Sequence, residues 1–304
     1  MHIGIVGHGA LGTLYGQAFS TVPEAEVIYI SNRERAERLR RSPLTANGEY
    51  FEYAVESPEE AQAVADIIVF AVKYHHLQQA VEDVRGHVGP DTTFISVMNG
   101  IDSEEYIASV YGKTHVLYSV ALGMDAVRRE HDTGFTTPGK LLLGRTGTTP
   151  QPDRDMHAFT SLCDAAGIAY EIQSDILRSI WSKFMLNIGV NQVSAILQAP
   201  YKPFQQPSHA QELMRAAMQE TIAVARTLNI HLYPEDIDKL IAVLQTLSAE
   251  GKTSMCQDIE AGRKTEVEML AGKLIELAER QGVDVPLNQT LYSLIKAKEG
   301  LAGA

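Results

Sequence analysis

The chain has 304 residues, 45% of them hydrophobic and 21% charged, which predicts a globular protein of about two domains. Its formal net charge of −12 argues against nucleic acid or an anionic membrane as a partner, because an acidic surface repels phosphate groups. The two cysteines, Cys163 and Cys256, are too few for a disulfide framework, and the chain opens on a strand pattern rather than a signal peptide, so we expect a cytoplasmic protein. No apolar run approaches the ~20 residues of a membrane span, and no histidine or cysteine spacing suits a metal site.

The first half of the chain alternates short β-rich runs with helical stretches. Strands are predicted at residues 2–6, 26–30, 65–72, 93–97 and 167–172, with further strands between 115 and 145 separated by a Thr-Gly and a Pro-Gly turn. One helix is predicted to follow the first strand and to end near residue 20, and a basic helix is predicted at 33–41.

After about residue 173 the strand patterns disappear. Helices are predicted at residues 175–198, 208–229, 234–249, 253–280 and 287–298, with prolines between most of them. We therefore expect an α/β Rossmann-type doubly wound sheet followed by an all-α C-terminal domain. The predicted division is an NADP-binding domain at 1–174 and a helical substrate and catalytic domain at 175–304.

A glycine-rich motif lies between the first strand and the first helix. Its residues fit G-x-G-x-x-G and are Gly7, His8, Gly9, Ala10, Leu11 and Gly12. In this motif the first glycine permits a tight turn, the second lets the backbone approach a pyrophosphate, and the third lets helix and strand pack closely. The helix N-terminus then offers N–H groups to the phosphates. A plain glycine turn is the alternative, but the strand–turn–helix context favours dinucleotide binding.

The end of the second strand indicates which dinucleotide is bound. An NAD enzyme carries an acid there to hold the ribose 2′-hydroxyl, whereas this chain has Ser31, Asn32 and Arg33. A guanidinium can hold a 2′-phosphate through charge-assisted hydrogen bonds, so Arg33 predicts NADP(H). The alternative is that Arg33 belongs to a solvated run with Arg35 and Arg38.

Two polar residues follow later strands, at the sheet edge where open α/β proteins bind ligands. Lys73 comes directly after one apolar strand, and Asn99 comes after the next, followed by Gly100. Lys73 could meet a cofactor phosphate or a substrate carboxylate, and Asn99 could offer its amide near the nicotinamide. A lysine reaching to solvent and a turn-forming Asn-Gly pair are the structural alternatives.

The helical half supplies a candidate proton donor. Lys183, Asn187 and Asn191 are spaced i, i+4 and i+8 on a helix that is otherwise apolar, so they form one polar stripe. A buried lysine is costly unless a polar group faces it, and an anionic substrate with a carbonyl would meet that need; pairing with a structural carboxylate is the alternative. On a second helix, Ser254 begins a capping-box pattern with Gln257, and Glu266 supplies a carboxylate if it points inward.

Together these motifs, in order over nearly the whole chain, resemble the ketopantoate reductase family. The resemblance implies NADPH-dependent reduction of ketopantoate to pantoate, on the route to pantothenate and coenzyme A. It implies Lys183 as the general acid and Glu266 as the residue that holds the substrate hydroxyl and positions Lys183. It also implies substrate binding by Asn187, Asn191 and Ser254, a cofactor-side role for Lys73 and Asn99, and 2′-phosphate binding by Arg33.

Three features depart from the family pattern. His8 lies inside the glycine loop, Met98 replaces a frequent glutamine, and residues 199–203 lack the family's usual asparagine and glycine. Two alternatives therefore stay open: an NADP-dependent D-2-hydroxyacid dehydrogenase acting on other branched 2-oxo acids, and a non-catalytic NADP-sensing regulator. The expected partner is a small anionic 2-oxo acid, and a homodimer is left open because the sequence carries no direct signal for one.

Overall fold

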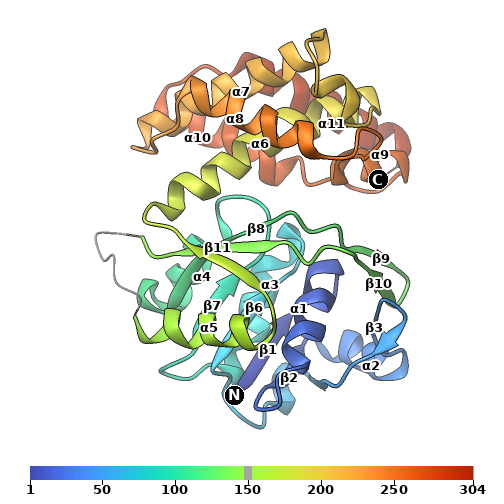
Figure 1. The fold of residues 1–304 in the computed structure, drawn as a ribbon, viewed down its shortest axis with the longest axis vertical. Coiled ribbons are helices and arrows are strands. Elements are labelled where there is room, and N and C mark those ends of the chain that lie inside the picture. Colours follow the sequence, from blue (N-terminus) through green and yellow to red (C-terminus); the bar gives the residue numbers. More distant parts are fainter. Residues whose placement is uncertain (147–152, 304) are drawn as a thin grey trace. The chain divides into compact units, whose positions relative to one another are not determined.

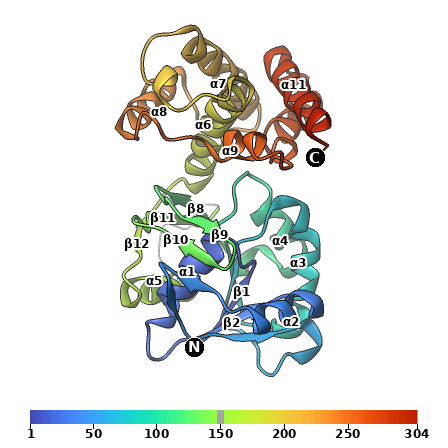
Figure 2. The same cartoon turned by 90° about the vertical axis from the view of Figure 1, so that its right-hand side faces the viewer.

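The computed structural model describes residues 1–146 and 153–303, and its contacts divide the chain into two compact units. Unit 1 is Met1–Ser179 and unit 2 is Ile180–Ala304. Unit 1 holds all the strands of the described chain, and unit 2 is helical (Figures 1 and 2). The predicted functional division at residue 174 stays a prediction.

Unit 1 is organised around an eight-stranded sheet with the order β12-β11-β8-β7-β6-β1-β2-β5. Its strands are β1 (His2–Val6), β2 (Glu26–Ile30), β5 (Ala54–Glu56), β6 (Ile67–Phe70), β7 (Thr93–Ser96), β8 (Val116–Leu122), β11 (Lys140–Gly144) and β12 (Ala169–Ile172). All neighbouring pairs are parallel except β8 and β11, which are antiparallel. The predicted bounds of β1 and β2 are confirmed, whereas β6 is shorter than the predicted strand at 65–72.

The strand order reverses at β1. From β1 the chain moves outward through β2 to β5 and then returns to place β6 on the other side of β1. Ligands of open α/β sheets bind beyond the carboxyl ends of the strands at such a reversal. This position is where the glycine loop lies, because the loop follows Val6 at the end of β1.

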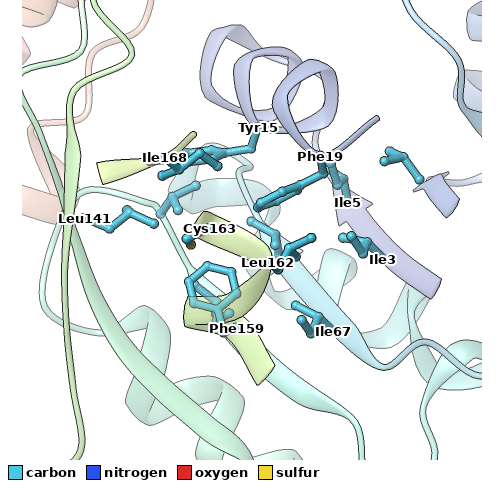
Figure 3. Packing of buried hydrophobic residues seen from close by; sticks show 14 of the residues in the cluster. Ile3, Ile5, Tyr15, Phe19, Ile67, Leu141, Phe159, Leu162, Cys163 and Ile168 are labelled. Carbon is cyan, nitrogen blue, oxygen red and sulfur yellow. The ribbon is translucent and has the colours of Figure 1, made fainter. Parts of the chain in front are cut away.

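Helices cover both faces of this sheet (Figure 2). α1 (Ala10–Ser20) and α5 (Arg154–Ala165) pack on one face, where Tyr15, Phe19 and Phe159 join Ile3 and other strand residues in one buried cluster (Figure 3). The other face is covered by α3 (Leu77–Asp83) and α4 (Ser103–Tyr111), and α2 (Arg33–Arg41) follows β2. β-Branched and aromatic strand residues thus meet helices on both faces, which explains the near-continuous apolar runs of the inner strands.

A second, small sheet with the order β4-β3-β10-β9 joins segments that are far apart in the sequence. Its strands are β3 (Thr45–Ala46), β4 (Glu49–Tyr50), β9 (Val127–Arg129) and β10 (Asp132–Gly134). The predicted Thr-Gly turn is wrong, because Thr133 and Gly134 lie within β10 and the hairpin turns at Glu130, whose φ is +53°. Pro138 and Gly139 lie in the connection between β10 and β11, where Gly139 has φ +68°, but the chain bends at Thr136 rather than at the predicted Pro-Gly pair.

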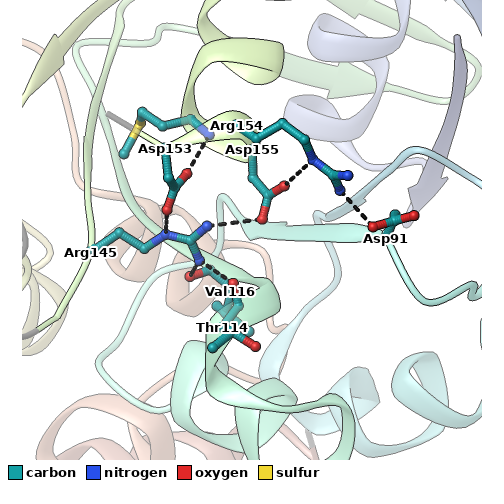
Figure 4. A network of polar contacts seen from close by, with 8 residues as sticks. Asp91, Thr114, Val116, Arg145, Asp153, Arg154 and Asp155 are labelled. Carbon is teal, nitrogen blue, oxygen red and sulfur yellow. Dashed lines mark hydrogen bonds and ion pairs between the residues drawn. The ribbon is translucent and has the colours of Figure 1, made fainter. Parts of the chain in front are cut away.

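A polar network ties the end of β11 to the start of α5 (Figure 4). Arg145 Nε donates to Asp153 Oδ2 at 2.8 Å, and its Nη2 donates to Asp155 Oδ2 at 3.0 Å. Its Nη1 donates to the carbonyl oxygens of Thr114 and Val116, at 2.6 and 2.9 Å. The guanidinium therefore holds β11, α5 and the segment before β8 together, with its charge balanced by two carboxylates.

Unit 2 consists of α6 (Ile176–Leu197), which begins in unit 1, and the helices that follow it: α7 (His209–Thr227), α8 (Pro234–Thr246), α9 (Ser254–Glu260), α10 (Lys273–Gln281) and α11 (Pro286–Ala302). α6 packs closely on α7, since a Cβ added at Gly189 would lie 2.6 Å from Met218 Cγ. No helix among the described residues has the length and apolarity needed to cross a membrane.

The helix predicted at 253–280 is wrong as a single element. α9 ends at Glu260, Gly262 adopts φ +63°, and a short π-helical turn, η6 (Glu268–Gly272), precedes α10. A positive φ cannot continue a right-handed helix, so Gly262 separates the two parts. Ser254 is also not a helix cap, because the Thr253 side chain occupies that position and accepts from the Cys256 N–H at 3.1 Å.

Candidate active site

The glycine loop has a different constraint at each of its three glycines. Gly7 has φ +100°, and a Cβ there would lie 2.5 Å from the carbonyl oxygen of Ala71. A Cβ at Gly12 would lie 1.9 Å from the carbonyl oxygen of Gly7. At Gly9 a Cβ would meet nothing within 4 Å. The fold therefore requires glycine at the first and third positions, whereas the second leaves open space at the start of α1.

The loop borders a cavity of about 490 Å³ at the carboxyl ends of β1, β2 and β6. The residues that line it belong to unit 1 and are Val6, Gly7, His8, Gly9, Ile30, Ser31, Asn32, Arg35, Arg38, Ala71, Val72, Lys73, His76, Gln79, Ala80, Asp83 and Arg128. The cavity thus brings the first three residues of the glycine loop together with Lys73, whose roles in cofactor binding stay predictions. Its size and its place at the strand reversal suit the adenosine and phosphate part of a dinucleotide.

The cavity is basic although the chain as a whole is acidic. Arg35, Arg38, Lys73 and Arg128 line it, and Asp83 is the one carboxylate among its described lining residues. Burial, together with the charges of Arg128, Arg35 and Arg38, lowers the pKa of His8 to about 4. His8 is therefore neutral at pH 7 and contributes hydrogen-bonding capacity to the loop without adding charge.

Arg33, the residue predicted to hold the 2′-phosphate, lies outside this cavity. Arg33 is exposed at the first position of α2 and does not line the cavity, whereas Arg35 and Arg38 do. Arg35 and Arg38 are three residues apart and share one face of the helix. Arg33 is two residues before Arg35 and therefore lies on a different face. The sequence contained this signal in the arginine spacing, whereas Arg128 comes from β9 and nothing in the local pattern indicated it.

Asn99 and Gly100 follow β7, where Gly100 has φ +98°. Asn99 does not line the cavity. Behind this turn lies a buried polar network that the sequence reasoning missed: Ser96 Oγ donates to Ser103 Oγ, and Ser103 Oγ donates to Glu104 Oε2, both at 2.7 Å. Glu104 is 3% exposed, and its burial raises the pKa of the carboxyl to about 7 in spite of these hydrogen bonds.

This shifted carboxyl predicts a pH-dependent stability. The pKa in the folded state lies above the ordinary value of 4.5, so stabilisation by the neutral acid is complete below pH 4.5 and is lost as the pH rises toward 7. A shift of this size corresponds to about 3 kcal/mol of unfolding free energy. We expect Glu104→Gln to remove this loss, so that urea denaturation at pH 4 and pH 8 shows a flatter dependence than in the wild type. Glu105→Gln, at the exposed neighbouring position, is the control, and an equal flattening there would contradict the assignment.

In unit 2 the structure places Lys183, Asn187 and Asn191 on α6, at the predicted helical spacing. The helix is buried as expected, with Phe184, Met185 and Ile188 fully packed, and Asn191 is also buried. One turn beyond Asn191, Ser194 Oγ lies 2.8 Å from the Thr253 Oγ1 that caps α9. This contact fixes the start of α9, and Ser254 with it, beside the C-terminal half of α6.

Glu266 does not lie on the second helix as predicted. It lies between α9 and η6, in a segment anchored by its neighbour Thr265. The Thr265 N–H and Oγ1 both donate to Glu299 Oε1 of α11, at 2.8 and 2.7 Å, and Lys296 Nζ donates to Glu299 Oε2 at 2.9 Å. Burial alone would raise the pKa of Glu299, but these hydrogen bonds lower it, so the anchor carries a charge at pH 7.

Two family models match the chain. The model described as ketopantoate reductase PanE/ApbA matches residues 3–147, and that for the C-terminal part of the same family matches residues 175–299. Among curated proteins, a 2-dehydropantoate 2-reductase of Aquifex aeolicus is 26% identical over 303 residues, covering 97% of this chain and 96% of the relative.

Solved structures show the same fold. A D-mandelate dehydrogenase, described in a ternary structure with NADH and anilino(oxo)acetate, has a TM-score of 0.86 at 23% identity and full coverage of both chains. A ketopantoate reductase of Staphylococcus aureus, described as dimeric, has a TM-score of 0.80 at 21% identity, again with full coverage. At these identities the likeness concerns the fold alone, and the fold class predicted from the sequence is confirmed.

Proposed function

Because the chain belongs to the ketopantoate reductase family of NAD(P)-dependent oxidoreductases, we propose that it reduces ketopantoate (2-dehydropantoate) to (R)-pantoate with NADPH, in pantothenate and coenzyme A biosynthesis. The observation that carries the proposal for this chain is the basic cavity at the glycine loop. Open space at Gly9 and the cationic lining both fit a dinucleotide pyrophosphate.

In this proposal the bound nicotinamide supplies the hydride, and the protein supplies a proton and holds the substrate. Lys183 Nζ gives its proton to the carbonyl oxygen as the carbonyl carbon receives the hydride, so the C=O becomes CH–OH. General acids of this kind contribute roughly 10²–10⁴-fold in rate. Glu266 holds the substrate hydroxyl and positions Lys183.

The other residues assigned to the site bind the substrate or the cofactor. Asn187, Asn191 and Ser254 hold the polar groups of the substrate, and burial of Asn191 strengthens such contacts because water competes less there. Lys73 and Asn99 serve the cofactor side, with Lys73 already at the cavity wall.

The preference for NADP(H) rests on the arginines of α2. Arg35 and Arg38 line the cavity, and Arg33 is the residue that the family pattern assigns to the 2′-phosphate. Measuring NADPH and NADH affinity in Arg33→Ala and Arg35→Ala tells them apart. Replacing the arginine that holds the 2′-phosphate is expected to weaken NADPH affinity about tenfold or more and to leave NADH affinity nearly unchanged. This is the size expected for the loss of one charge-assisted hydrogen bond. Equal losses for both cofactors would assign that arginine to the fold.

A D-2-hydroxyacid dehydrogenase acting on other branched 2-oxo acids is the second candidate. It is favoured by the shared fold of a D-mandelate dehydrogenase and by the unusual residues at 199–203. An NADPH-linked panel of ketopantoate, ketoisocaproate and phenylpyruvate decides between the two. Faster turnover of ketoisocaproate or phenylpyruvate would overturn the first proposal, and tight NADPH binding with no turnover of any 2-oxo acid would support a sensing role instead.

Two further features of the proposal concern assembly and location. A homodimer is proposed because a structural relative is described as dimeric. A cytoplasmic location is proposed because both cysteines, Cys163 and Cys256, are free and buried, as suits a reducing compartment.

A further inference from the structure

The cavity contains a cationic group that the Rossmann motif does not supply. Arg128 lies on β9 of the small sheet, yet its side chain lines the same cavity as the glycine loop, Arg35 and Arg38. Its charge also acts on His8, as those of Arg35 and Arg38 do. Three guanidinium groups from two separate parts of unit 1 therefore line one cavity with the glycine loop, and the charge of each lowers the pKa of His8.

One end of this guanidinium is left without a hydrogen bond. Arg128 Nε donates to the carbonyl oxygen of Glu130 at 2.8 Å, which holds the side chain against its own hairpin. Its Nη1 is buried and has no hydrogen-bond partner among the described residues. A charged group with a covered, unpartnered donor carries a desolvation cost, and an anion in the cavity that Arg128 lines would lower this cost through its charge.

The tyrosines near Arg128 do not supply a negative charge that would pair with it. The pKa values of Tyr29 and Tyr53, which lie near its charge, are raised by burial, so both phenols are neutral and supply no counter-charge at pH 7. Burial lowers the pKa of Arg128 itself, but an arginine stays protonated at pH 7. The group is thus a fixed cation at the cavity wall.

Four cations line the cavity: Arg35, Arg38, Lys73 and Arg128, with Asp83 as the described carboxylate among the lining residues. Arg38 Nη2 also lies 3.3 Å from Glu34 Oε1 of its own helix, whereas Arg128 reaches the cavity from outside the βαβ unit. A phosphomonoester adds roughly −1.5 to −2 charges at pH 7. NADPH carries this group and NADH does not, and Arg128 adds a cation to the cavity wall that can bind it.

We propose that Arg128 is a specificity-determining residue that binds the 2′-phosphate of NADPH from the small sheet, opposite the arginines of α2. This rests on the proposed use of NADPH but adds a residue from outside the βαβ unit to the recognition of the cofactor. The small sheet then forms one wall of the cofactor site, and its hairpin is held more firmly when NADPH is bound.

The test compares Arg128→Met with Arg129→Met, the neighbouring residue, which is exposed and does not line this cavity. Affinities for NADPH, NADH, 2′,5′-ADP and 5′-ADP are measured by titration, with thermal unfolding of the ligand-free proteins alongside. We expect Arg128→Met to weaken the affinities for NADPH and 2′,5′-ADP by about 10- to 100-fold. The affinities for NADH and 5′-ADP should change less than about twofold. Arg129→Met leaves all four unchanged.

The unfolding measurement separates binding from a structural role. Arg128 is half-buried and its Nε makes one hydrogen bond to its own hairpin, so Arg128→Met should change the melting temperature of the ligand-free protein only slightly. A lowered melting temperature with equal losses for both dinucleotides would overturn the proposal and leave the proposed function intact. Failure of the wild type to bind either dinucleotide would instead overturn the proposed function. Arg128→Lys, which keeps the charge but loses the planar fork, should recover part of the NADPH affinity.

Discussion

Replacing Lys183 by alanine is expected to lower the turnover of the 2-oxo acid at least about a hundredfold, because the developing alkoxide loses its proton donor. Steady-state kinetics with saturating NADPH measures this loss. NADPH affinity should stay within about twofold, since Lys183 is assigned to proton transfer rather than to cofactor binding. Near-normal turnover in Lys183→Ala would show that another group supplies the proton.

Two further variants separate proton transfer from charge and from helix packing. Lys183→Arg keeps a cation on α6, but a guanidinium does not release its proton near neutral pH, so turnover should stay low while the substrate still binds. Lys239→Ala removes an exposed lysine of α8 that pairs with Asp236 at 2.7 Å, and it should leave turnover unchanged. Full activity in Lys183→Arg would mean that Lys183 contributes only its charge.

The glycine loop should respond in opposite ways to two alanine substitutions. Gly9→Ala is expected to leave the free energy of unfolding unchanged, because its Cβ meets nothing within 4 Å, but to weaken NADPH at least about tenfold by filling the space of the pyrophosphate. Gly12→Ala is expected to cost about 3 kcal/mol of unfolding free energy, because its Cβ would lie 1.9 Å from the Gly7 carbonyl oxygen. Urea denaturation and NADPH titration on both variants check this.

The contrast between the two substitutions gives the control. Both add one methyl group to the same loop, so a general sensitivity of the loop would make them behave alike. Tyr29 OH donates to the Gly12 carbonyl oxygen at 2.8 Å, which leaves the start of α1 little freedom to move away from a new side chain. Unchanged stability in Gly12→Ala, or unchanged NADPH affinity in Gly9→Ala, would contradict the role given to that glycine.

Much of the fold could be predicted because local pattern and tertiary structure agree. β1, β2 and α2 have the predicted bounds, since β1 and β2 are mostly apolar and β-branched and α2 is mostly charged, and glycine or polar residues follow each of them. The family resemblance is confirmed as well, because its motifs are spread over both halves of the chain. β9 and β10 fall within the strands predicted between 115 and 145, but β3, β4 and their pairing with β10 could not be predicted, because strands of two residues show no periodicity and form only through pairing across the chain.

The residues that line the cavity could be anticipated where a motif is local and could not where a residue reaches across the fold, while the roles of the candidate site residues stay predictions. The glycine loop and Lys73 meet at one cavity because strand ends bring them to the same edge. Arg128 enters that cavity from a different sheet, and Glu104 is titratable near pH 7 only because its surroundings are buried. A short stretch of sequence shows neither which distant segments come into contact nor how deeply a residue is buried.

The pairing of β3 with β10 also bears on how the protein folds. Thr45 Oγ1 donates to Asp132 Oδ1 at 2.7 Å across 87 residues of chain, and only two residue pairs join the strands. Closing so long a loop for so few contacts is unfavourable until the main sheet has brought its ends together, so the small sheet should form late and open early. Its amides are expected to exchange with solvent faster than those of β1 and β6, which makes the hairpin with Arg128 the last part of the cofactor cavity to assemble.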